Sequence, residues 1–241
     1  FKFLALVVVF SMLLTACAQP VPVAPAAPSA SAAQGAAPAA GGGATEAGAA
    51  QRGGVWTRVT ASDAGNLNPV LNDNTASSDV SYLLYDVGLL GTDLDTGEIT
   101  CDLALCDSWT VSDDGLVFTF KLKDTFNWND GKPITAQDFK YTYDAIKSDL
   151  VESPRKYVWD SIASIEAPDD KTVVVTYNKL RCDALSDLGN PLMPAHIFKA
   201  DFSDIQESPE NFAPTVGSGP FNFQSWVRDD NLIITRNEKY Y

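Results

Sequence analysis

Polar and apolar residues alternate most regularly between residues 107 and 123. The apolar residues occupy every second position, with mostly polar residues between them. These apolar residues are Leu116, Phe118, Phe120 and Leu122. A period of two is typical of a half-buried strand. The turn Ser112-Asp113-Asp114-Gly115 precedes this run, and a short apolar strand over 108–111 precedes the turn. The pattern therefore predicts a β-hairpin here.

A helix is predicted directly after a second turn at 129–131. Thr135 has the position of an N-cap, and Asp138 three residues later completes a capping-box pattern, with Asp in place of the preferred Glu. Ile134 and Phe139 are spaced to form a hydrophobic staple. The apolar residues of the helix share one face: Phe139, Tyr143 and Ile146.

Weaker patterns predict the remaining elements. The expected helices cover 76–84, with Val80, Leu83 and Leu84 facing inward, and 180–189. The expected strands are 55–60 and those of two further hairpins, one within 162–177 and one joining 221–226 to 232–236. Turns or loops are expected at 63–74, 93–97, 148–157 and 212–218.

The N-terminal region has the pattern of an export signal. Residues 1–14 are apolar but too few to span a bilayer, so they are interpreted as the core of a signal peptide, with 1–16 removed. Small residues before Cys17 resemble a bacterial lipobox, which implies a diacylglycerol on its sulfur. The alternative is an ordinary secretory signal with an incidental cysteine. Residues 17–52 are rich in Ala, Pro and Gly and are predicted to form a disordered tether.

Charge and composition exclude several function classes. The chain of 241 residues has a net charge of −14, so a nucleic-acid partner is not expected. His196 is the single histidine, which excludes a His-rich metal site, and its neighbours favour a structural role. The paired carboxylates 113–114, 169–170 and 229–230 lie at predicted turns, where Asp is common. No catalytic residue, metal or cofactor is therefore predicted, and a monomer is expected.

Three cysteines remain beyond Cys17: Cys101, Cys106 and Cys182. An exported protein permits disulfides, and three cysteines favour one bridge and one free thiol. The sequence does not determine which two cysteines pair.

Several motifs in order along the chain resemble the family 5 extracellular solute-binding proteins, the receptors for oligopeptides, dipeptides and nickel chelates that feed ABC importers. They are Trp109, the 112–115 turn, Phe118-Thr119-Phe120, Trp128-Asn129-Asp130-Gly131, Thr135-Ala136-Gln137-Asp138-Phe139, Pro191–Ile197 and Val216–Phe221. The resemblance runs from Gly53 to the end. The segment Tyr85–Leu90 departs from the family pattern, with Asp86-Val87-Gly88 in place of Glu-Gly. The segment 101–109 resembles a strand of the family, with Cys106 and Asp107 in place of Ala-Glu.

The resemblance implies a mixed α/β fold of the periplasmic-binding-protein type II-like, bilobal kind, present here in part. Segments 53–86 and 191–241 would belong to the first lobe and 87–190 to an inserted β-rich subdomain. Because family members are about twice as long, the second lobe is expected to be absent from this chain.

The implied function is that of a substrate-binding lipoprotein of an ABC importer, which captures peptides or similar small solutes by lobe closure. Its partners would be the solute, the permease and, through the lipid on Cys17, the outer face of the cell membrane. Two alternatives stay open, an exported sensor-type binding module and a carboxylate-dependent exported hydrolase.

The resemblance also implies ligand-contact residues. One set is the loop after Asn68-Pro69, with Asp73, Asn74 and Thr75. A second is Arg155, where relatives often carry Tyr after Ser-Pro. Its guanidinium is able to hold a carboxylate, so Arg155→Ala is expected to weaken the binding of anionic ligands at least tenfold. The alternatives are a solvated loop and a surface arginine.

A third candidate is the turn formed by Gly217, Ser218 and Gly219, which is expected near the floor of the cleft. The alternative is a turn without a binding role. The motif is weak as a phosphate loop, because no lysine follows and Pro220 leads into a strand.

Overall fold

The computed structural model of the chain describes residues 53–102 and 104–241. The predicted signal peptide, Cys17 and the whole of the predicted tether lie outside the described residues. Residues 56–241 form one compact unit, and the description that follows concerns this unit. No helix in the described part of the chain is long and apolar enough to cross a membrane.

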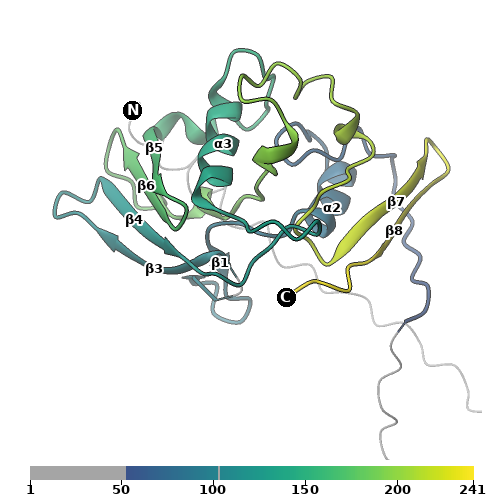
Figure 1. Cartoon of the computed structure of the whole chain (residues 1–241), viewed down its shortest axis with the longest axis horizontal. Coiled ribbons are helices and arrows are strands. Elements are labelled where there is room, and N and C mark those ends of the chain that lie inside the picture. Colours follow the sequence, from purple (N-terminus) through teal and green to yellow (C-terminus); the bar gives the residue numbers. More distant parts are fainter. Residues whose placement is uncertain (1–52, 103) are drawn as a thin grey trace, which may run out of the picture. The chain divides into compact units, whose positions relative to one another are not determined.

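The main sheet has four antiparallel strands in the order β3-β4-β6-β5 (Figure 1). The strands are β3 (Cys106–Val111), β4 (Val117–Leu122), β5 (Ile162–Asp169) and β6 (Thr172–Tyr177). Phe120 lies opposite Trp109 on β3 and opposite Val173 on β6. Both predicted hairpins of this region are confirmed, because β3 pairs with β4 and β5 pairs with β6 in antiparallel register. The alternating residues Phe118, Phe120 and Leu122 are buried, as predicted.

Helix α3 (Ala136–Lys147) packs against β5 and β6 (Figure 1). Its capping box is confirmed, since the backbone N–H of Thr135 donates to Asp138 Oδ2 at 2.9 Å. Asp138 also accepts from the N–H of Ala195 at 3.0 Å, so it joins the start of α3 to a distant segment. Burial raises the pKa of the Asp138 carboxyl group, and these N–H donors oppose the rise. The predicted apolar face is buried: Phe139, Tyr143 and Ile146.

Helix α2 (Thr75–Leu84) begins at the N-cap Asn74, whose side chain accepts from Ser77 N at 2.8 Å. The predicted helix is confirmed, but its inward face differs from the prediction. Val80 and Leu83 are only half-buried, and the fully buried positions are Ala76, Ser77, Ser81 and Leu84. The buried serines are not apolar, so hydrophobic spacing alone does not identify this face.

Two smaller hairpins complete the strands. The strands β1 (Gly91–Thr92) and β2 (Ile99–Thr100) enclose the predicted turn at 93–97, and β7 (Phe221–Val227) pairs with β8 (Asn231–Arg236). The hairpin predicted at 221–236 is thus confirmed. Short 3₁₀ helices occur at η1 (Val158–Ser161), η2 (Ser186–Gly189), η3 (Ala195–Ile197) and η4 (Pro209–Asn211).

The prediction of a strand at 55–60 is wrong. Residues 55–60 form no regular secondary structure, and Trp56 and Val59 are 79% and 91% exposed. Alternation creates a strand only when a partner strand supplies hydrogen bonds, and none of the described strands pairs with this segment.

Two further predictions need correction. The segment 180–189 is not a helix but a series of turns ending in η2, because Arg181 binds the nearby carboxylates of Asp183 and Asp187. The strand expected over 101–109 begins only at Cys106. A disulfide joins Cys101 to Cys106, and Ala104 N donates to Cys101 O, so the chain bends before β3.

Candidate ligand pocket

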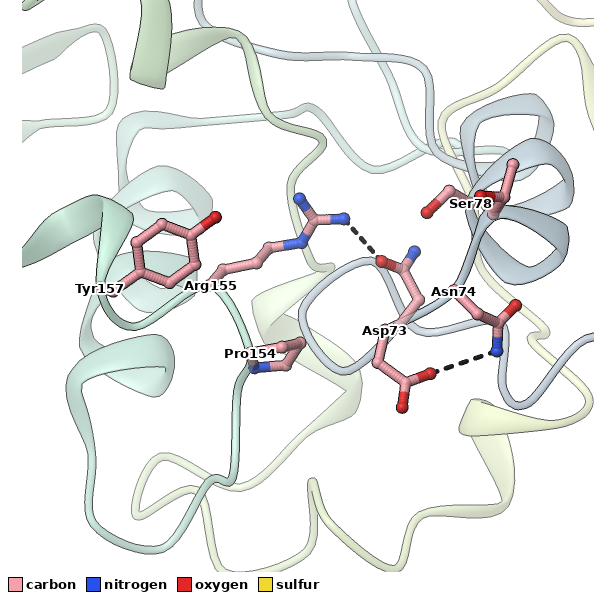
Figure 2. A pocket seen from close by; sticks show the side chains of 8 residues that line it. Asp73, Asn74, Ser78, Pro154, Arg155 and Tyr157 are labelled. Atoms are coloured by element: carbon pink, nitrogen blue, oxygen red, sulfur yellow. Dashed lines mark hydrogen bonds between the residues drawn. The ribbon is translucent and has the colours of Figure 1, made fainter.

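An open pocket of about 390 Å³ brings together two of the three predicted contact sites (Figure 2). One wall is the loop before α2 with the first turn of that helix, and the other is the segment after α3 that leads into η1. The lining residues are Asn72, Asp73, Asn74, Thr75, Ser78, Pro154, Arg155 and Tyr157. The predicted residues Asp73, Asn74, Thr75 and Arg155 therefore share one pocket.

Side-chain amides shape the first wall. Asn68 Oδ1 accepts from Val70 N at 2.9 Å, and Asn68 Nδ2 donates to Asn211 Oδ1 at the same distance. These bonds hold the Asn68-Pro69 loop tightly, and Asn74 then caps α2. The positive N-terminal end of α2 consequently opens onto the pocket.

Ser153 connects the two walls. Its buried hydroxyl donates to Val70 O at 2.7 Å and accepts from the backbone N–H of Arg155 at 3.2 Å. The serine of the Ser-Pro motif thus has a structural role, because it fixes the backbone that carries Arg155.

Figure 2 shows Arg155 across the pocket from α2. Its guanidinium is held by three neutral acceptors. Nε donates to Pro69 O at 2.8 Å, Nη2 to Asn72 Oδ1 at 2.5 Å and Nη1 to Asn190 Oδ1 at 3.4 Å. These contacts hold the guanidinium in place, and its contact with a ligand stays a prediction.

Sequence reasoning did not identify Asn72 or Tyr157. Asn72 is almost completely buried beside Arg155, whereas Tyr157 is 76% exposed on the rim. An asparagine in an Asn-rich loop indicates a turn, so only the contact with Arg155 distinguishes Asn72 from its neighbours.

The third predicted site, Gly217-Ser218-Gly219, does not line this pocket. The N–H groups of Ser218 and Gly219 donate to Leu84 O at 3.0 and 2.8 Å, at the C-terminal end of α2. These contacts give the segment a packing role. Its part in ligand binding stays a prediction.

His196 also lies outside the pocket. Its Nε2 is 2.9 Å from Asp130 Oδ2, and its ring packs edge-on against Trp128. Within residues 53–102 and 104–241, no group of three or more His, Cys, Asp or Glu side chains is arranged to hold a metal ion.

Comparison with known proteins gives the family. Residues 101–241 match the bacterial extracellular solute-binding proteins, family 5 Middle. The chain belongs to this family. It is 32% identical over 179 residues to a putative ABC transporter peptide-binding protein of Brucella ovis, covering 73% of this chain and 33% of that protein. It is 27% identical over 201 residues to the oligopeptide-binding protein AppA of Bacillus subtilis, covering 81% and 36%.

Solved structures support the same fold. AppA of Bacillus subtilis in complex with a nonapeptide matches with a TM-score of 0.67 at 25% identity, over 75% of this chain and 36% of that one. NikZ of Campylobacter jejuni in complex with Ni(L-His) matches with a TM-score of 0.62 at 25% identity, over 73% and 34%. The predicted α/β periplasmic-binding-protein fold is thus confirmed, and the chain spans about a third of the length of these relatives.

Proposed function

We propose that this chain is part of the substrate-binding receptor of an ABC importer, which captures peptides or similar small solutes and performs no chemistry. The observation that supports this most directly is the pocket, where the two segments predicted to touch ligand meet in a member of the solute-binding family. Relatives named as peptide-binding proteins of ABC transporters favour an importer over a sensor or a hydrolase.

The proposed architecture has two lobes. Segments 53–86 and 191–241 would contribute to the first lobe and 87–190 to the inserted subdomain, while further sequence would supply the second lobe. Solute would bind between the lobes and select the closed state. The ligands bound in two similar structures, a nonapeptide and Ni(L-His), differ widely in chemistry.

The proposed location is the outer face of the cell membrane. Cys17 would carry the lipid, residues 17–52 would form the tether, and the receptor would deliver solute to the permease as a monomer. The support for this part is the sequence pattern alone.

Native mass spectrometry of the complete protein, purified gently from its own host, tests the proposal. A bound mass that matches peptides is the expected result. A bound chelate or sugar would support the receptor function but show that the solute is not a peptide. A pooled solute at about 100 times Kd should add roughly 2.7 kcal/mol to the free energy of unfolding. Absence of both bound mass and stabilisation would contradict the receptor function.

A further inference from the structure

Arg155 differs from the other arginines that the structure describes. Four of them have a carboxylate oxygen within 4.0 Å: Arg58, Arg181, Arg228 and Arg236. Arg155 donates only to a backbone carbonyl and two amide oxygens, all uncharged. A half-buried cation without a counter-ion among the described residues, in a chain of net charge −14, is suited to an external anion.

The guanidinium is already oriented for such a contact. It carries five N–H hydrogens, and the three bonds use one on Nε and one on each Nη atom. Each Nη atom therefore keeps one further hydrogen. Because the side chain is fixed beforehand, an incoming anion does not have to order it.

Asn72 supplies a second unused donor. Its side chain is 3% exposed, and its Oδ1 accepts a hydrogen bond from Arg155. The Nδ2 atom of the same amide therefore does not contact Arg155. That buried Nδ2 has no hydrogen-bond partner among the described residues, although Asn72 lines the pocket. Buried donors are rarely left without a partner, and an acceptor that enters the pocket beside Arg155 would satisfy this one.

The N-terminus of α2 adds to the same positive field. The first turn of this ten-residue helix lines the pocket, and the backbone N–H groups of Thr75 and Ala76 donate to no described residue. A helix N-terminus with free N–H groups favours a negative charge. Arg155, Asn72 and α2 thus point to one kind of ligand group.

We propose that this pocket binds a carboxylate of the solute, between Arg155, Asn72 Nδ2 and the start of α2. The inference rests on the proposed receptor function and names the chemical group that the receptor selects. Asp73 lies on the same pocket, with its carboxylate turned toward Asn74 rather than the Arg155 guanidinium (Figure 2). That negative charge disfavours a dianion such as phosphate and leaves a singly charged carboxylate as the better match.

The variant Asn72→Asp separates binding from packing. The new carboxylate keeps an acceptor for Arg155 Nη2, so the local structure should be retained. It also neutralises Arg155 and replaces the unused Nδ2 donor by an oxygen. The matched control is Gln224→Glu, which makes the same change of charge at an exposed residue outside the pocket.

The experiment is a titration of the complete protein, labelled with ¹³C and ¹⁵N arginine, with sodium acetate against sodium chloride at equal ionic strength. The Arg155 signals should shift saturably with acetate, while those of Arg58 and Arg236 serve as internal controls. Asn72→Asp should weaken acetate binding at least tenfold without lowering the melting temperature, and Gln224→Glu should leave it unchanged. Inorganic phosphate at pH 8 should bind more weakly than acetate.

Three results would overturn the inference: no saturable shift of Arg155, an equal shift of all arginines, or acetate binding by Asn72→Asp as tight as in the wild type. Tighter binding of phosphate would overturn the carboxylate assignment. Acetate is only a probe of the pocket, so these results are independent of whether native mass spectrometry finds a captured solute.

Discussion

The backbone of α2 approaches Gly217 and Gly219 so closely that neither position has room for a side chain. A Cβ atom on Gly219 would lie 2.2 Å from Leu83 O, and one on Gly217 would lie 2.5 Å from Leu84 O. Real Cβ atoms do not approach backbone atoms so closely, and neither oxygen is free to move without disturbing the helix end. The glycines are thus explained by packing, whether or not ligand also approaches them.

We predict that Gly219→Ala lowers the free energy of unfolding by about 3 kcal/mol, because the backbone must shift to admit a methyl group. Urea denaturation followed by tryptophan fluorescence measures the change. The control is Gly131→Ala, where φ is 91° but nothing lies within 4 Å of the added Cβ. That variant should lose only about 1 kcal/mol. Equal losses in the two variants would contradict the packing argument.

The cysteines give a second prediction at this scale. Cys101 and Cys106 are joined, whereas Cys182 is free and exposed. Iodoacetamide applied to the folded, non-reduced protein should therefore modify Cys182 and spare the other two, as read by peptide mass spectrometry. By chain entropy, loss of the disulfide through Cys106→Ser should cost about 2 kcal/mol. Cys182→Ser should change stability little, and protection of Cys182 from the reagent would contradict its exposure.

At the scale of elements, Asp138 connects the start of α3 to the segment around Ala195. Its carboxylate accepts from the N–H groups of Thr135 and Ala195, which are 60 residues apart in sequence. The capping box predicts the first bond, whereas the second depends on the tertiary fold. The Asp138 carboxylate thus stabilises a tertiary contact as well as the N-terminus of α3.

We predict that Asp138→Ala lowers the free energy of unfolding by about 2 kcal/mol, since it leaves two backbone donors without their acceptor. Thermal or urea denaturation would measure the loss. Asp144→Ala on the same helix is the control, because Asp144 pairs only with Lys140 at a side chain that is 36% exposed. Its loss should stay below about 0.5 kcal/mol. A loss at Asp138 as small as this would show that Ala195 does not depend on it.

Elements with strong local signals were predictable from sequence, and elements that depend on distant partners were not. Alternation and the Thr135 cap identify the main hairpins and α3 because both signals act within a few residues. The strand expected at 55–60 has the same kind of alternation but lacks a partner among the described strands. The pocket follows this rule as well, since Arg155 was identified by its motif and Asn72 only through the folded contact.

At the scale of the whole molecule, the chain spans about a third of the length of the binding proteins that it matches. It covers 33% and 36% of the two relatives compared above. The pocket is open to solvent, so its two walls enclose little of a ligand. Binding proteins of this kind gain affinity by enclosing the solute, which removes apolar surface and polar groups from water together. The open pocket should therefore bind far more weakly than the complete protein.

We predict that the isolated segment 53–241 binds peptides with a Kd weaker than about 1 mM, which corresponds to roughly 4 kcal/mol of binding free energy. The complete protein should bind the same peptides with at least micromolar affinity, because the second lobe would close over them. Isothermal titration of both proteins with one casein-hydrolysate pool measures the difference, and circular dichroism verifies that the segment is folded. Micromolar binding by the folded segment would show that this part of the chain forms a sufficient site without a second lobe.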